Sequence, residues 1–149
     1  MVFLLIEKSP SVEDFMKLRK AAGMPSRSIE GIHRGINNSL FSVIIIEEKE
    51  KLTRTVGMGR IIGDGGTVYH ICDMVVLPEL QDQGLGSMMM DSIMNYIRKN
   101  APKSSYVSLM ADVSGFYEKW GFEDSSPTKG MFYRTCLLYT SDAADERLR

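Results

Sequence analysis

The stretch DMVVLPELQDQGLGS, from Asp73 to Ser87, decides the fold of this chain. Its apolar beginning predicts the end of a strand, and Gln81-x-x-Gly84-x-Gly86 after the proline predicts the turn into a helix. Such a turn directs several backbone N–H groups into one small space, next to the positive end of the helix dipole. These donors suit a phosphate or pyrophosphate, and glycine suits the turn because a Cβ would hold the anion away from the backbone.

The glycine pattern is not specific by itself. Gly-x-Gly also occurs at residues 57–59 and 63–65. A tight turn that caps a helix would explain the pattern without any ligand. The remaining sequence therefore has to decide between the two interpretations.

The composition of the 149 residues is that of an ordinary globular domain, with 44% hydrophobic residues, 25% charged residues and a net charge of −1. This balance offers no electrostatic attraction for nucleic acid or for an anionic membrane, so neither partner is expected. The apolar run at residues 2–6 is too short for a signal peptide or a spanning helix. Cys72 and Cys136 are too few for a disulfide scaffold or a metal knuckle, which favours a reducing cytoplasm and no bound metal.

Hydrophobic periodicity predicts an α/β (α+β) domain, in which a mixed sheet carries helices on its faces. The predicted order is β-α-α-β-β-β-α-β-α-β-β. The predicted strands are residues 2–7, 41–48, 53–62, 67–77 and 106–110, followed by a closing hairpin through 121–133. The predicted helices are residues 11–22, 28–36, 84–100 and 114–120, and the third of them should bury Leu85, Met88, Met89, Ile93 and Ile97.

With that order of elements, the Gln81–Ser87 turn and the later FYEKWGF at residues 116–122 give the chain a resemblance to the GNAT superfamily of acyl-CoA-dependent N-acetyltransferases. The resemblance covers roughly residues 2 to 135 and implies a single GNAT-like acetyltransferase domain at residues 1–135. It also implies a mostly antiparallel sheet, in which the strand before the glycines splays from the strand after the helix. In the family acetyl-CoA lies in that gap, so acetyl-CoA is the expected co-substrate.

The resemblance assigns the co-substrate to two neighbouring segments. Backbone groups of the strand end are expected to contact the pantetheine arm and the acetyl carbonyl, and main-chain N–H groups of the turn are expected to bind the pyrophosphate. The first set is Met74, Val75 and Val76, and the second is Gln81, Asp82, Gln83, Gly84, Leu85, Gly86 and Ser87. The alternative for Val75 and Val76 is that they belong to the buried core of the strand. The two interpretations are compatible, because the side chains can pack in the core while the backbone groups bind the co-substrate.

Tyr117 matches the tyrosine with which members of the family often protonate the departing CoA thiolate. The chemistry needs such a donor because a thiolate leaves more readily when a proton arrives with it. A phenol with a pKa of about 10 is still protonated at neutral pH. The alternative is a tyrosine that only packs its short helix onto the sheet.

His70 is the candidate base, at a position that resembles the one of a catalytic Glu or His in some members of the family. A base is needed because an alkylamine with a pKa near 10.4 is neutral in roughly one molecule in a thousand at pH 7.4. Strand alternation places His70 and Cys72 on one face and Asp73 on the other. A lone strand histidine is more often structural, so Asp73, Asp112 and water stay open as alternatives.

The resemblance thus implies transfer of acetyl from acetyl-CoA to a primary amine of a small molecule by direct nucleophilic attack. A covalent acyl intermediate on Cys72 is a minor variant. Two further functions stay open: a protein or peptide N-acetyltransferase, and a non-catalytic acyl-CoA-binding module. Members of the family often pair, so a homodimer is compatible with the sequence, but no residue establishes it.

The chain departs from the family pattern at two places. Many relatives carry an Asn seven residues before the tyrosine, where this chain has Met110, which puts one co-substrate contact in doubt. Residues 136–146 resemble the translation of a sequencing-library adaptor, so residues 136–149 are interpreted as a non-native tail. A genuine polar extension is the alternative.

Overall fold

The computed structural model describes residues 2–135, which divide into two compact units, one ending at Met110 and the other beginning at Ala111. The first unit contains a five-stranded sheet in the order β1-β2-β3-β4-β5. The strands are β1 (Val2–Ile6), β2 (Phe41–Lys49), β3 (Leu52–Gly63), β4 (Val68–Val76) and β5 (Tyr106–Leu109). Neighbouring strands from β1 to β4 are antiparallel, and β5 alone runs parallel to its neighbour β4. The predicted fold class, a mixed and mostly antiparallel sheet, is confirmed.

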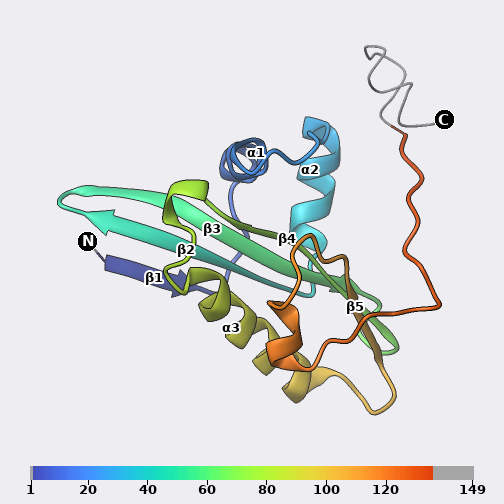
Figure 1. Cartoon of the computed structure of the whole chain (residues 1–149). Helices are drawn as coiled ribbons and strands as arrows, with labels where there is room; N and C mark the ends of the chain where they lie inside the picture. Colours follow the sequence, from blue (N-terminus) through green and yellow to red (C-terminus); the bar gives the residue numbers. More distant parts are fainter. Residues whose placement is uncertain (1, 136–149) are drawn as a thin grey trace. The chain divides into compact units, whose positions relative to one another are not determined.

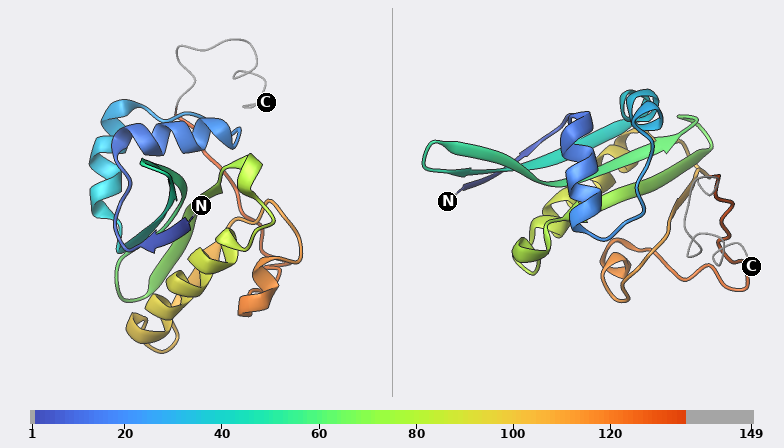
Figure 2. Two further views of the ribbon diagram at one scale, coloured as in Figure 1. Left: turned by 90° about the vertical axis from the view of Figure 1, so that its left-hand side faces the viewer. Right: turned by 90° about the horizontal axis from the view of Figure 1, so that it is seen from above.

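Helices cover both faces of this sheet (Figures 1 and 2). One face carries α1 (Val12–Ala21), α2 (Ile29–Gly35) and the 3₁₀ turn η1 (Ile36–Asn38), and the other carries α3 (Leu85–Asn100). Ser11 and Ser28 cap the first two helices, since each hydroxyl accepts a hydrogen bond of 3.0 Å from the backbone N–H three residues on. Ser11 and Ser28 are the first residues of the helices predicted at 11–22 and 28–36.

The helices bury apolar stripes against the sheet. On the α1 face the core consists of Phe15, Leu18, Ile32, Ile36, Ile44, Met58 and Val75. On the opposite face α3 buries Leu85, Met89, Met90, Ile93 and Ile97. The prediction of Met88 in this stripe was wrong, and its side chain is 37% exposed. A rotation of 100° per residue brings Met90 rather than Met88 to the side of Ile93 and Ile97.

A β-bulge interrupts the pairing of β3 with β4. Met58 pairs with Val75 and Arg60 pairs with Cys72, so Gly59 lies opposite two residues, Asp73 and Met74. Asp73 has a positive φ of 55°, in the left-handed region that Asp tolerates better than most residues. Strand alternation therefore stops at Cys72, and the prediction that Cys72 and Asp73 point to opposite faces has to be corrected.

The pairing of the two central strands ends partway along β4, in agreement with the splay that the family resemblance implies. β4 pairs with β5 from Val68 with Tyr106 to Ile71 with Leu109, and β4 then continues through residues 72–76 without that partner. The 3₁₀ turn η2 (Pro78–Leu80) follows and leads into α3. The residues predicted to contact acetyl-CoA thus follow directly on the point where the two strands part.

The second unit differs from the predicted end of the fold. In place of the helix 114–120 it contains one 3₁₀ turn, η3 (Tyr117–Trp120), and residues 111–135 contain no strand, so the predicted closing hairpin is absent from the described residues. Local polar contacts compete with pairing here: the Asp124 carboxylate accepts hydrogen bonds of 2.7 Å from the backbone N–H and the hydroxyl of Ser126. Pro127 has no N–H to donate to a ladder. The interpretation of residues 136–149 lies outside the described residues, and the boundary at residue 135 stays a prediction.

Candidate active site

The turn between β4 and α3 has a backbone that only certain residues adopt. Gly84 is the N-cap of α3 with a left-handed φ of 83°, and Asp82 has a φ of 64°. A Cβ at Gly84 would meet no atom within 4 Å, so glycine is required by the backbone conformation and not by a close neighbour. The Gln81 side chain donates a hydrogen bond of 3.2 Å from Nε2 to the Val76 carbonyl, which ties the turn to the end of β4.

The first turn of α3 presents unpaired donors. The Met88 N–H donates to the Gly84 carbonyl at 3.0 Å. The N–H groups of Leu85, Gly86 and Ser87 precede this bond and, as in any helix, have no partner within it. No acidic residue lies in the first turn, and no side chain caps it. These features fit the pyrophosphate of acetyl-CoA, since no carboxylate of the first turn of α3 competes with an anion for these donors.

The end of β4 provides the second segment. Val75 is 3% exposed and packs in the core of the α1 face, whereas Met74 and Val76 are half-buried. In a strand, successive residues direct their N–H and C=O groups alternately to the two neighbours. Beyond Ile71 the groups directed away from β3 have no β5 residue to pair with. Val75 can therefore belong to the strand core and also lie in the co-substrate site. Its side chain packs in the core, and this part of β4 has backbone N–H and C=O groups that are not paired with β5.

A buried ion-pair network fixes the bulge. Arg19 of α1 and Arg60 of β3 both donate to the Asp73 carboxylate, Arg19 to Oδ1 and Arg60 to Oδ2, the latter at 2.8 Å. The side chains of Arg19 and Asp73 are 6% and 9% exposed. Arg19 also donates to the Pro25 carbonyl at 2.7 and 3.2 Å, and Arg60 donates to the Gly35 carbonyl at 3.3 Å. Helix α1, the loop after it and two strands are therefore joined through one carboxylate.

Sequence reasoning missed both arginines. A weak signal existed for each: Arg19 follows Phe15 by one helical turn on the buried face, and Arg60 stands inside the apolar second half of β3, residues 56–62. A partner could not be assigned from the sequence, because the arginines lie 54 and 13 residues from Asp73. The pairing follows from the fold alone.

The network changes the roles available to two candidates. Both oxygens of Asp73 are bound to guanidinium groups, which makes this carboxylate a poor general base. Burial raises the pKa of the Cys72 thiol to about 11, and the neighbouring Asp73 charge and hydrogen bond act in the same direction. A thiol with this pKa contains very little thiolate at neutral pH, which argues against the covalent variant on Cys72.

His70 lies half-buried on β4, one residue before the last pair with β5. Its Nδ1 lies 3.0 Å from the Ser108 hydroxyl of β5, its register partner. The tautomer that donates from Nδ1 to Ser108 leaves Nε2 as an acceptor, which is the arrangement that a base requires. Ser108 was not singled out in the sequence, because its place beside His70 depends on the parallel register of β4 and β5.

Tyr117 belongs to the second unit, where it begins η3. Its ring packs edge-on against Phe116 at 5.0 Å and Phe122 at 6.4 Å between centroids. Burial, with a smaller contribution from the Asp112 carboxylate, raises the pKa of the phenol. The hydroxyl therefore keeps its proton at neutral pH, as a general acid must.

Within residues 2–135 no group of three or more His, Cys, Asp or Glu side chains is arranged to hold a metal ion. No helix in the same range has the length and apolar character needed to cross a bilayer.

Comparison with known proteins assigns this arrangement to a family. Residues 39–124 match a family model described as an acetyltransferase (GNAT) domain. An uncharacterized N-acetyltransferase, ycf52, from Porphyra purpurea is 30% identical over 135 residues, which cover 89% of this chain and 76% of the relative.

Solved structures agree with this match. A probable acetyltransferase of unknown function from meticillin-resistant Staphylococcus aureus superimposes with a TM-score of 0.83 at 39% identity, over 90% of this chain and all of that one. A predicted acetyltransferase from Clostridium acetobutylicum, solved with acetyl-CoA, shares the fold with a TM-score of 0.60 at 19% identity, over 87% of this chain and 96% of that one.

Proposed function

Because this chain belongs to the GNAT family of acetyltransferases, we propose that it transfers the acetyl group of acetyl-CoA to a primary amine of a small molecule. The observation that carries the proposal is the end of β4. The strand separates from β5 after Ile71 and leads, through a glycine turn, into a helix whose first N–H groups are unpaired. A strand with free backbone groups beside an anion cradle suits a long ligand with a pyrophosphate at its middle.

Each part of the chain has a separate task in binding the co-substrate. The N–H groups of residues 81–87, with the α3 dipole, bind the pyrophosphate. Backbone groups of residues 74–76 bind the pantetheine arm and the acetyl oxygen, and an N–H near Val75 stabilises the negative charge that develops on that oxygen. Acetyl-CoA supplies an activated acyl group with a thiolate leaving group.

Proton transfer is assigned to His70 and Tyr117. His70 and Val75 are five residues apart, roughly 16 Å at about 3.3 Å per residue, so one water cannot bridge them and His70 removes the amine proton through a chain of several waters. Tyr117 gives its proton to the departing thiolate, a role supported by the raised pKa of its phenol. Asp112 stays an alternative base, whereas the two guanidinium partners of Asp73 disfavour that residue.

The amine attacks directly in this proposal. A neutral amine reacts readily with a thioester once the two are positioned, so no acyl-enzyme is needed. The pKa of about 11 at Cys72 supports the same conclusion. A cytoplasmic location and a homodimer are compatible with this function and stay predictions.

The test is acetyl-CoA-dependent thiol release with arylalkylamines, polyamines, aminoglycosides, amino acids and short peptides. Tyr117→Phe and His70→Ala should each lower turnover about 10²-fold or more. Tyr133→Phe and His33→Ala serve as matched controls, because Tyr133 is 91% exposed and His33 is exposed on α2. Loss in Tyr117→Phe alone would transfer the role of base to Asp112 or water.

Two other functions make different predictions in the same assay. A non-catalytic acyl-CoA-binding module would bind acetyl-CoA without releasing thiol for any amine. A protein acetyltransferase would turn over peptides and leave small amines unchanged. Either result would replace the small-molecule proposal.

A further inference from the structure

One acidic side chain lies inside the turn that is proposed to bind the pyrophosphate. Asp82 is exposed and has a φ of 64°, two residues before Gly84, which adopts the same left-handed region with a φ of 83°. From residue 82 to residue 87 no backbone N–H donates a hydrogen bond to another group of residues 2–135. Asp82 therefore places a carboxylate in a segment whose backbone is suited to an anion.

The Asp82 carboxylate has no counter-ion in the part of the chain that the structure describes. It makes no ion pair with any residue from 2 to 135. Its neighbour Glu79 in η2 differs, because that carboxylate lies 3.9 Å from the guanidinium of Arg54. The charge of Glu79 is thus partly balanced, whereas Asp82 adds an unbalanced negative charge to the turn.

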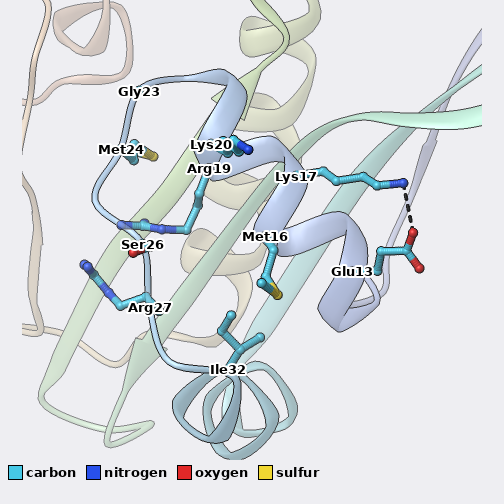
Figure 3. Close-up of a pocket in the computed structure, with 10 residues that line it drawn as sticks. All are labelled: Glu13, Met16, Lys17, Arg19, Lys20, Gly23, Met24, Ser26, Arg27 and Ile32. Carbon is cyan, nitrogen blue, oxygen red and sulfur yellow. Dashed lines mark ion pairs between the residues drawn. The ribbon is translucent and has the colours of Figure 1, made fainter. Parts of the chain in front are cut away.

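No cation in the same stretch of chain balances this carboxylate. Residues 78–87 contain no Lys or Arg, and the last turn of α3, with Arg98 and Lys99, lies about 20 Å along the helix axis from the first turn. Several cations, among them Lys17 and Lys20, line a pocket of about 690 Å³ beside α1 (Figure 3). That pocket belongs to the other face of the sheet, since α1 covers one face and α3 the opposite one (Figure 2).

We propose that the Asp82 side chain lowers the affinity of the turn for acetyl-CoA and thereby sets the KM for this co-substrate. The inference rests on the proposed function, because it takes the pyrophosphate to lie on the N–H groups of residues 81–87. A carboxylate in the same turn repels the negative charges of the pyrophosphate, and this repulsion opposes the attraction of the donors and of the α3 dipole. Asp82 is a residue that determines affinity, and it touches no reacting atom.

The size of the effect follows from the exposure of the side chain. Exposed charges near a helix N-terminus change a binding constant by roughly twofold to fivefold at low salt. Since a pyrophosphate carries more than one charge, we expect the upper end, about fivefold. The pyrophosphate is unchanged by acetyl transfer, so the repulsion is equal in the ground state and the transition state and raises KM without lowering kcat. The rate then follows the acetyl-CoA concentration over a range about fivefold wider.

The test is calorimetric titration of acetyl-CoA into the full chain and into Asp82→Asn. Asn removes the charge, has nearly the same shape and tolerates the left-handed φ, so folding is not at risk. The Kd should fall about fivefold at low salt, and the KM measured by thiol release should fall by about the same factor with little change in kcat. At about 1 M salt, where the Debye length is about 3 Å, the two chains should bind acetyl-CoA nearly equally.

Three controls separate the charge from other effects. Asp82→Gly also removes the charge and should bind acetyl-CoA like Asp82→Asn, although glycine adopts this φ more readily. Glu50→Gln is the matched variant, because Glu50 is an exposed acid with a φ of 58° in the turn between β2 and β3, and it should bind like the parent chain. S-acetylpantetheine, which lacks the pyrophosphate, should bind equally to the parent chain and to Asp82→Asn.

Each other outcome has a definite meaning. An unchanged or higher Kd in Asp82→Asn, a gain confined to Asp82→Gly, or an equal gain for S-acetylpantetheine would overturn the inference and leave the proposed acetyl transfer intact. If the parent chain does not bind acetyl-CoA, the proposed function and this inference both fall. If the two chains bind acetyl-CoA with the expected difference but acetylate no amine, the inference stands on the calorimetry and only the proposed transfer falls.

Discussion

Replacing Asp73 by Asn removes one negative charge from between two guanidinium groups that are mostly buried. The side chains of Arg19, Asp73 and Arg60 are 6%, 9% and 18% exposed. Asn is the appropriate substitution because it has nearly the same shape and also tolerates the left-handed φ of 55° at this position. The change therefore isolates the charge from the strain of the bulge.

The expected cost follows from what each arginine retains. Breaking a buried ion pair by removing one partner typically costs about 3–5 kcal/mol. Arg19 keeps its hydrogen bonds to the Pro25 carbonyl, and Arg60 keeps those to the Gly35 carbonyl and to the Ser39 hydroxyl. Their charges are nevertheless left without a counter-ion. We therefore expect the lower end of the range, about 3 kcal/mol of the free energy of unfolding.

The assay is urea unfolding followed by fluorescence and circular dichroism. With an m value of about 2 kcal/mol per molar, a loss of about 3 kcal/mol lowers the midpoint by about 1.5 M. The control is Glu30→Gln, which removes a carboxylate from the exposed pair of Glu30 with Arg34, where the side chains are 74% and 77% exposed. Such a pair contributes about 0.3–0.5 kcal/mol.

A loss below about 1 kcal/mol in Asp73→Asn would refute the reasoning, because it would mean that the network contributes no more than an exposed ion pair. A double-mutant cycle with Arg19→Gln separates the energy of the ion pair between Arg19 and Asp73 from the other effects of each substitution. The two changes should couple by about 1 kcal/mol or more if the ion pair itself is the source of the loss. Acetyl-CoA affinity should fall with stability in Asp73→Asn, because the bulge sets the course of the strand end.

Four further predictions concern the three residues Cys72, Gly84 and Tyr117. In a Cys136→Ser background, iodoacetamide should alkylate Cys72 about 100-fold more slowly at pH 7.5 than it alkylates an ordinary thiol. The reason is that the pKa of the Cys72 thiol is raised from 9.0 to about 11. An alkylation rate equal to that of free cysteine would contradict this prediction. The same pKa shift means that the neutral Cys72 thiol contributes its full share to the free energy of unfolding below about pH 9, and that this contribution is lost as pH rises through about 11. In Cys72→Ala the free energy of unfolding should no longer fall over this pH range for this reason. Gly84→Ala should lower the free energy of unfolding in urea by about 1–2 kcal/mol and weaken acetyl-CoA binding in calorimetry, because the φ of Gly84 is 83°. The control is Gly35→Ala inside α2, where a Cβ would meet no atom within 4 Å, and this change should be neutral or slightly stabilising. Because burial raises the pKa of Tyr117, kcat should show no alkaline loss due to this group until above pH 10, and a loss near pH 8 would exclude it as the acid.

The local features of the site were predictable from the sequence. The helix predicted from Gly84 begins at Leu85, with Gly84 as its cap, and the helices predicted from Ser11 and Ser28 begin directly after these serines, which cap them. Caps and glycine turns are decided by residues a few positions apart, so their signals are complete within a short window. The separation of the central strands was also predicted, although from the family resemblance and not from periodicity.

The features that depend on distant residues were missed. Alternation failed at Asp73 because the bulge results from pairing with β3 and from two arginines elsewhere in the chain. The contact of His70 with Ser108 depends in the same way on the register of two strands with a helix between them. The prediction of the closing hairpin was wrong, because it relied on the apolar residues near the end of that segment. In the structure, local polar contacts around Pro127 favour an irregular backbone instead of strands.

The sequence by itself determined the type and order of nearly all elements in residues 2–110, the glycine turn and the family of the chain, because propensity, periodicity and capping act between near neighbours. Only the tertiary structure decided what surrounds each charged side chain. It enclosed Asp73 between Arg19 and Arg60. The physical reason is that the energy of a charge depends on the burial and on the partners that folding brings to it, and both come from residues far away in the chain.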